Sequence, residues 1–191
     1  DELEAKPRFR LRELDQFKPL VRDSQLATTP GETFNYSNTG MLLLGAVIAQ
    51  ASGEDYYAYV QRHIFAPAGM TATASDLIDD PVENLAIGYT RAPASAYGWR
   101  ENSIRILRRG IPAGGGFSTV GNLHRFALAL QSNKLISQAS LQRLWADEDR
   151  DNYAAGFEIG HGAVGAAAGH SGLDAGVSTR MRLYLDRGYV A

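Results

Sequence analysis

The amino-acid sequence predicts an α+β fold, in which helices dominate up to about residue 147 and strands follow. The first part carries apolar residues at helical spacing, bounded by Ser, Thr, Asp and Gly residues that suit helix ends. The last part carries alternating apolar and polar residues instead. With 45% hydrophobic residues the chain can bury a core, so disorder is excluded.

The most strongly predicted helix covers residues 38–51, which Ser37 or Asn38 can cap and Gly53 can end. Its residues are apolar on nearly every face, and such a helix is normally buried on nearly every face. Four further helical segments follow from spacing and capping residues: 11–20, 55–64, 119–131, and a short one after residue 137.

The strands are predicted in the C-terminal part. Residues 71–112 show no clear period and are expected to form loops and short strands. Residues 153–159 form a predicted strand, and the alternation over 178–185 predicts a half-buried one. Residues 186–188 then suit a turn into a return strand at 189–191. Because that strand stops so soon, we expect the chain to be a fragment whose sheet exposes an unpaired edge.

Composition excludes several function classes. The charges nearly balance, with 19 Lys and Arg against 21 Asp and Glu, which argues against non-specific nucleic-acid binding. Without cysteine there is no thiol nucleophile and no thiolate metal site, and the four histidines show no ligand spacing, so no metal or other cofactor is expected. No apolar run approaches the roughly 18 residues of a membrane span. The cellular compartment stays open.

Two short motifs carry candidate site residues. Tyr36 and Asn38 lie two positions apart at the start of the predicted apolar helix, which would orient both side chains from a rigid element. His170 lies beside the small residues Ser171 and Gly172 on a predicted strand. Taken alone, the first motif also suits a helix-entry turn with a packing aromatic residue, and the second a strand residue that faces solvent.

These motifs and three further segments resemble the serine β-lactamase and penicillin-binding-protein superfamily, in particular its branch of class C β-lactamases, D-alanyl-D-alanine carboxypeptidases and esterases. Residues 30–38 resemble its P-G-x-x-F-x-Y-S-N motif, 39–53 its following helix, 64–70 its I-F-x-P-L-G-M motif, 113–126 its A-G-G-x-x-S-T-x-x-D-L-x-R-F motif, and 169–172 its G-H-x-G motif.

The resemblance implies a partial β-lactamase/transpeptidase-like fold: part of a helical domain at 1–115 with the Tyr-x-Asn motif, and part of a mixed α/β domain at 116–191 with the His-x-Gly motif. The antiparallel sheet would be flanked by helices.

The resemblance also implies catalytic roles for Tyr36, Asn38 and His170. The family's nucleophile is the serine of an S-x-x-K motif, and a hydroxyl nucleophile needs a nearby base. Tyr36 would be that base or a proton relay, and Asn38 would hydrogen-bond the substrate. His170 stands where many relatives carry Lys and would polarise Tyr36, relay a proton or hold a substrate carboxylate. We expect the three side chains to lie within about 10 Å of each other.

The same resemblance implies a substrate-binding strand edge at Ser171, Gly172 and Leu173. The small residues Ser171 and Gly172 would let the substrate approach the strand. The backbone N–H of Leu173 would supply half of an oxyanion hole. The expected partner is a small-molecule or peptide substrate: a β-lactam, a D-amino-acid peptide or an ester.

The chain departs from the family because it contains no S-x-x-K motif. None of its three lysines, Lys6, Lys18 and Lys134, has a serine three positions before it. Since the motif precedes Tyr-x-Asn in the family, we expect it upstream of residue 1, and we expect the chain alone to be inactive. A catalytically degenerate binding or regulatory module, and an unrelated α+β interaction domain, remain as alternatives. An open cleft between Tyr36 and His170 would argue against the unrelated domain.

Overall fold

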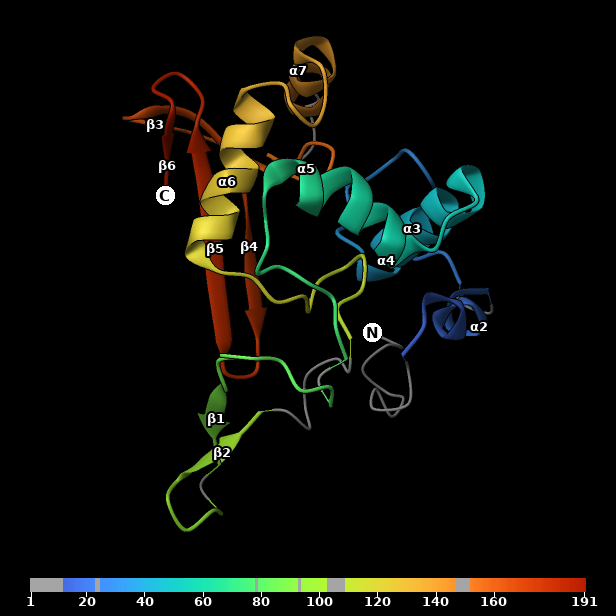
Figure 1. Cartoon of the computed structure of the whole chain (residues 1–191). Helices are drawn as coiled ribbons and strands as arrows, with labels where there is room; N and C mark the ends of the chain where they lie inside the picture. The colour runs from blue at the N-terminus through green and yellow to red at the C-terminus, as the bar shows by residue number, and fades with distance from the viewer. Residues whose placement is uncertain (1–11, 23–24, 78, 93, 103–108, 147–151) are drawn as a thin grey trace.

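The chain folds into a group of helices and one main antiparallel sheet (Figure 1). The computed structural model describes residues 12–22, 25–77, 79–92, 94–102, 109–146 and 152–191. In the described part, helices account for most regular structure before residue 147, and the four strands of the main sheet follow. This order confirms the predicted α+β class.

The main sheet has the strand order β3-β4-β5-β6, and all neighbours are antiparallel. Its core lies where Ala168 pairs with Ile159 on one side and with Leu183 on the other, and all three residues are buried. The burial of Leu183 is the outcome that the alternation over 178–185 predicts. The strand bounds are β3 Glu158–Gly162, β4 Gly165–Asp174, β5 Val177–Tyr184 and β6 Tyr189–Val190.

The predicted strand at 153–159 is wrong in its first half, because β3 begins only at Glu158. Gly156 adopts a φ of 84°, and the N–H of Ala154 donates to the carbonyl of Phe157. The chain therefore turns before β3, and the backbone of Tyr153 pairs with the sheet through an isolated bridge to Glu158.

One edge of the sheet is largely open. Strand β6 pairs only with Leu183 and Tyr184, and Ala191 extends the pairing to Arg182. In the described part of the chain, residues 177–181 of β5 have no strand partner on that side. This is the kind of exposed edge that the strand pattern predicts.

Helix α3 (Asn38–Ser52) has the predicted ends. The Ser37 Oγ accepts a hydrogen bond from the Gly40 N–H at 3.0 Å, and Gly53 closes the helix with a φ of 70°. The expected burial on nearly every face is wrong. Of its apolar side chains only Leu42 is fully buried, whereas Leu43, Leu44 and Val47 are exposed by 47%, 57% and 60%.

The buried face of α3 packs on a small cluster from distant segments. Leu42 contacts Leu14 and Phe17, together with Ile111 from the loop before α6. The two N-terminal residues belong to the 3₁₀ helix η2 (Leu14–Phe17), which continues into α2 (Lys18–Arg22); Leu11, the first residue of the predicted segment, lies outside the described residues. These partners and the following helix, which begins at Tyr56, cover only part of α3, so Leu43, Leu44 and Val47 meet solvent.

The predicted helix at 55–64 runs on to Ala68. Asp55 caps α4 (Tyr56–Val60), a π-helical stretch η3 (Gln61–Phe65) follows, and α5 (Ala66–Ala68) ends at Gly69 with a φ of 72°. Pro67 lacks the N–H that a continuing α-helical ladder requires, which accounts for the altered hydrogen bonding before it.

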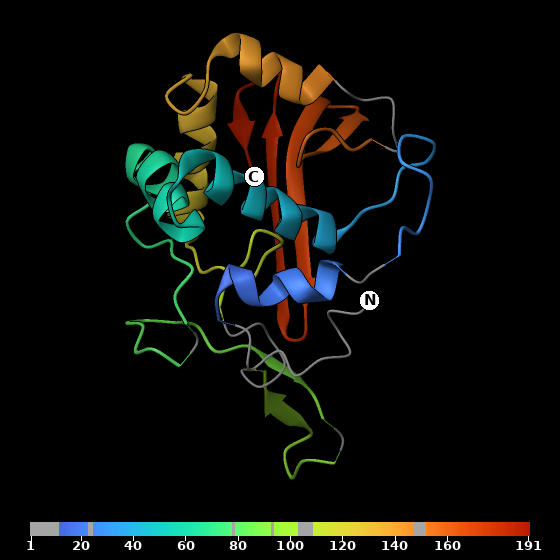
Figure 2. The same cartoon turned by 90° about the vertical axis from the view of Figure 1, so that its right-hand side faces the viewer.

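Two later helices complete the helical part: α6 (Val120–Gln131), capped by Thr119, and α7 (Gln138–Ala146), preceded by Ser137. Helices α5 and α6 pack through a cluster that contains Ala68, Met70 and Ala129. Figure 2 shows α3 in front of the main sheet. None of the described helices combines the length and apolar character needed to cross a bilayer.

A small hairpin of β1 (Tyr89–Arg91) and β2 (Trp99–Glu101) projects beyond the turn between β4 and β5 in both views (Figures 1 and 2). Its base is fixed to that turn. A Cβ on Gly88 would lie 2.7 Å from the Gly176 carbonyl oxygen, so only glycine permits this approach. The buried Asn102 side chain donates to the Ala175 carbonyl at 2.7 Å.

Candidate active site

An open cleft of about 2250 Å³ lies between the main sheet, the start of α3 and the loop that leads into α6. The structure brings all six sequence-predicted site residues to its lining: Tyr36, Asn38, His170, Ser171, Gly172 and Leu173. The cleft is larger than the roughly 300–1,000 Å³ usual for small-molecule sites. It therefore has room for an extended substrate or for further protein groups.

Tyr36 and Asn38 reach this cleft from the start of α3. They flank Ser37, whose side chain caps the helix, so the cap fixes the backbone on which both side chains stand. Both residues are exposed, Tyr36 by 45%. Within the described ranges, neither the Tyr36 hydroxyl nor the Asn38 amide forms a hydrogen bond. Their polar groups are thus available to a ligand.

His170 faces Tyr36 across the cleft from strand β4. The two ring centroids lie 6.1 Å apart, within the separation expected from the sequence. Tyr153 joins them: its ring meets Tyr36 edge-on with centroids 5.6 Å apart, and its Oη lies 2.9 Å from His170 Nε2. Three rings from three distant segments therefore form one cluster.

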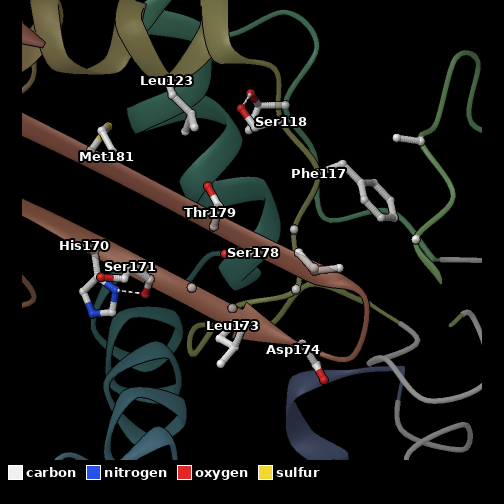
Figure 3. Close-up of a pocket in the computed structure, with 18 of the residues that line it drawn as sticks. Phe117, Ser118, Leu123, His170, Ser171, Leu173, Asp174, Ser178, Thr179 and Met181 are labelled. Atoms are coloured by element: carbon white, nitrogen blue, oxygen red, sulfur yellow. Dashed lines mark hydrogen bonds between the residues drawn. The ribbon is translucent and has the colours of Figure 1, made fainter. Parts of the chain in front are cut away.

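Two hydrogen bonds hold the His170 ring in place. Its Nδ1 lies 2.6 Å from the carbonyl oxygen of Ser171, which only accepts, so Nδ1 carries a hydrogen (Figure 3). Burial, with smaller contributions from Tyr36 and Glu158, raises the pKa of Tyr153 to about 12, so Tyr153 keeps its proton, and its hydroxyl forms a hydrogen bond with Nε2. Both nitrogens of His170 are therefore engaged in hydrogen bonds.

Glu158 ties β3, β4 and β5 together beside His170. Its carboxylate accepts the Ser171 N–H at 2.9 Å and the Ser171 hydroxyl at 2.7 and 2.9 Å, and Arg182 Nη2 donates to it at 2.8 Å. Burial alone would raise the pKa of Glu158. The Ser171 hydrogen bonds, Arg182 and His170 outweigh burial and hold that pKa below its usual value.

The strand register explains how these side chains meet. Gly169 pairs with Glu158 of β3 and with Arg182 of β5, so all three positions share one face of the sheet. Because Gly169 has no side chain, nothing separates the carboxylate from the guanidinium.

The edge of β4 is open beyond Glu158. Pairing with β3 ends at Gly169, and β4 continues to Asp174. The N–H of Ser171 points away from β5, toward Glu158, and alternation along a strand gives Leu173 the same direction. Figure 3 shows Ser171 and Leu173 along β4, with Thr179 and Met181 on the neighbouring β5. The Leu173 N–H therefore lies on the free strand edge.

Sequence reasoning missed three residues of this cluster: Tyr153, Glu158 and Arg182. None belongs to a motif that the sequence singled out. The alternation over 178–185 puts Arg182 on the other face of the strand from Met181. That pattern was the one available signal for Arg182, and it did not indicate which residue would pair with it. The pairing of Glu158 with Arg182 depends on the register of three strands, which no local pattern carries.

Comparisons with known proteins agree with the fold. A family model described as Beta-lactamase matches residues 2–191. A penicillin-binding protein of Bacillus subtilis is 32% identical over 173 residues, which cover 82% of this chain and 38% of that protein. The crystal structure of a penicillin-binding protein from Bacillus halodurans superposes with a TM-score of 0.88 at 26% identity, covering 98% of this chain and 59% of that one.

A D-amino acid amidase from Ochrobactrum anthropi SV3 shares the fold, with a TM-score of 0.78 at 22% identity over 98% of this chain and 59% of that one. This chain spans only 37% and 38% of the length of two relatives from Bacillus subtilis. The predicted β-lactamase/transpeptidase-like fold is confirmed.

Proposed function

This chain belongs to the Beta-lactamase family of serine hydrolases, and from that premise we propose that it carries one part of an acyl-transfer site, whose nucleophilic serine lies in a segment outside these 191 residues. The observation that carries the proposal is the approach of Tyr36 and His170. They come from a helix start and a strand far apart in the sequence, yet their rings lie 6.1 Å apart in an open cleft.

The available groups suit hydrolysis through an acyl-enzyme. A serine hydroxyl attacks the substrate carbonyl and passes its proton to Tyr36, acting as base or relay. The oxyanion that forms accepts a hydrogen bond from the Leu173 N–H, and the Asn38 amide holds the substrate in place. The leaving group then departs with the proton from Tyr36, and water hydrolyses the acyl-enzyme by the same path in reverse.

A phenol becomes an effective base beside a cation, which stabilises its deprotonated form. Among the described residues that line the cleft, Arg182 is the one Lys or Arg, and it is paired with Glu158. We therefore assign the missing cation, like the nucleophile, to an S-x-x-K motif in another segment. The substrate would be a β-lactam, a D-amino-acid peptide or an ester.

The test compares this chain with a longer protein that contains it together with an S-x-x-K segment. Both are treated with a fluorescent fluorophosphonate, which labels activated serines, and with a p-nitrophenyl ester. We expect labelling and turnover only in the longer protein, and loss of both when the motif serine is replaced by alanine. Labelling of a serine in the 191-residue chain, or turnover by it, would contradict the proposal. An inactive longer protein that still binds substrate analogues would favour a degenerate binding module.

A further inference from the structure

We propose that this cleft selects acyl substrates that carry no carboxylate near the scissile bond, and that Glu158 sets this preference. The substrate class is then neutral or cationic esters and amides. The inference rests on the proposed function, because it concerns the same site. It follows from three observations: the Ser171 hydroxyl is bonded to Glu158, both nitrogens of His170 are hydrogen-bonded, and the cleft lining is acidic.

The hydroxyl of Ser171 is committed to Glu158. It lies 2.7 and 2.9 Å from the two carboxylate oxygens, and a hydroxyl has only one proton to donate. The N–H of Ser171 is used by the same carboxylate at 2.9 Å. A substrate carboxylate beside Ser171 would therefore meet acceptors rather than donors, because each donor already points at Glu158.

Among the described residues that line the cleft, no unpaired Lys or Arg compensates at this point. The Arg182 guanidinium is held by Glu158 at 2.8 Å, and its position is fixed by that contact. Both nitrogens of His170 are already used, because Nδ1 donates to the Ser171 carbonyl and Nε2 forms a hydrogen bond with the Tyr153 hydroxyl. A charged His170 would lie 4.0 Å from Glu158 and would be neutralised by it before it reached a substrate anion.

The described lining of the cleft is acidic as a whole. Against the single guanidinium stand six carboxylates: Asp76, Asp80, Glu83, Glu101, Glu158 and Asp174. Like charges that line one cleft reinforce each other, because the protein walls keep the field inside it. Such a lining repels an anionic substrate, leaves a neutral one unaffected and attracts an ammonium group.

The experiment uses two aryl esters that differ only in charge. The 3-carboxyphenyl and 3-carbamoylphenyl esters of one acyl group have leaving groups of the same shape, one anionic and one neutral. In the longer, S-x-x-K-containing protein we expect kcat/KM to be at least tenfold higher for the carbamoyl ester, with most of the difference in KM. Glu158→Gln keeps an acceptor for Ser171 but removes the negative charge. It should lower the ratio of kcat/KM between the carbamoyl and carboxyl esters at least threefold.

The matched control is Asp186→Asn, which removes one negative charge at a residue that does not line the cleft and instead accepts the Ala166 N–H. This variant should leave the ratio unchanged. Equal rates for the two esters, or a faster carboxyl ester, would overturn the inference. If Glu158→Gln leaves the ratio of the two kcat/KM values unchanged, Glu158 does not set the preference.

A binding measurement separates this inference from the proposed function. If neither ester is hydrolysed, the proposed function fails, but the 191-residue chain can still be titrated with benzamide and with benzoate. We expect benzamide to shift the NMR signals of His170 and Ser171 at concentrations at which benzoate does not. Tighter binding of benzoate, or no difference between the two, overturns the inference by itself.

Discussion

The two walls of the cleft are built in opposite ways. On the β4 wall, the donors and acceptors of Ser171 and His170 are bonded to Glu158, Tyr153 or the backbone. On the α3 wall, the Tyr36 hydroxyl and the Asn38 amide have no hydrogen-bond partner in the described part of the chain, although helix capping fixes their backbone.

This difference separates groups that hold the site in shape from groups that react. A bonded network fixes its members before any ligand arrives, and it leaves them little capacity for new bonds. An exposed hydroxyl on a rigid helix start is oriented but unoccupied. The contrast therefore predicts chemical effects from changes on the α3 wall, and structural or selectivity effects from changes on the β4 wall.

The largest effect is expected from Tyr36→Phe in the longer protein. The substitution keeps the ring contacts with Tyr153 and His170 but deletes the hydroxyl. We expect kcat for an activated ester to fall by roughly 10²–10⁴-fold, the range usual for a general acid or base, with a smaller change in KM. Tyr97→Phe, at a hydroxyl on a 91% exposed residue, is the control and should retain full activity. Full activity in Tyr36→Phe would show that the Tyr36 hydroxyl does not react, which contradicts the assignment of the reacting groups to the α3 side of the cleft.

The next effect concerns the stability of the β4 wall. A Cβ on Gly169 would lie 1.9 Å from the Met181 carbonyl oxygen, so Gly169→Ala must push β4 away from β5. We expect a loss of roughly 1–3 kcal/mol or more in the free energy of unfolding, the usual range for overpacking, measured by urea denaturation. Gly162→Ala adds the same methyl group where no atom lies within 4 Å. A similar loss in both variants would show that the close contact is not the cause.

A smaller effect is expected from Tyr153→Phe, which removes the hydroxyl that is hydrogen-bonded to His170 Nε2. The lost hydrogen bond should cost about 0.5–1.5 kcal/mol, and the ¹⁵N signals of His170 should report a less uniform tautomer. Because the pKa of Tyr153 is raised to about 12 in the folded state from 10.0, its contribution is complete below pH 10 and is lost as pH rises toward 12. Tyr153→Phe should therefore lose less of its free energy of unfolding than the unaltered chain as pH rises from 10 toward 12. An unchanged alkaline profile would contradict the assignment.

The smallest effect is expected from Glu158 in acid. Its pKa is lower in the folded than in the unfolded protein, so the stability it contributes is present above the ordinary carboxyl pKa and is lost as pH falls below about 4. The groups that face the Glu158 carboxylate are Ser171, His170 and Arg182. Glu158→Gln should flatten the acid side of the stability profile, measured by thermal melting. The control Glu32→Gln changes a residue in an exposed turn and should leave the acid side of the profile unchanged. Equal flattening in both variants would refute the prediction.

The parts of this molecule that follow from local chemistry were predictable from the sequence. Ser37 and Gly53 mark the ends of α3 because capping needs only neighbouring residues. The convergence of Tyr36 with His170 was predictable only through the resemblance, since no spacing rule joins residues so far apart. The roles of these residues stay predictions.

What the sequence could not provide depends on register and on partial packing. The Glu158–Arg182 pair needs three strands in one alignment. Similarly, an apolar helix pattern reports which faces suit burial, not which faces meet a partner, so the exposure of Leu44 and Val47 on α3 was not foreseeable.

The attachment of the β1–β2 hairpin has a consequence for how such a chain can diversify. The contacts that orient it lie at its base, at Gly88, Gly176 and Asn102, while Tyr97 at the tip is almost fully exposed. Evolution can therefore lengthen or rewrite the tip without disturbing the sheet, because exposed loop tips tolerate insertion. Glu101 at the base lines the cleft and Tyr97 at the tip does not, so a rewritten tip would leave the described lining of the cleft in place. The hairpin tip is thus a position at which a new surface for other molecules can arise at little cost in stability.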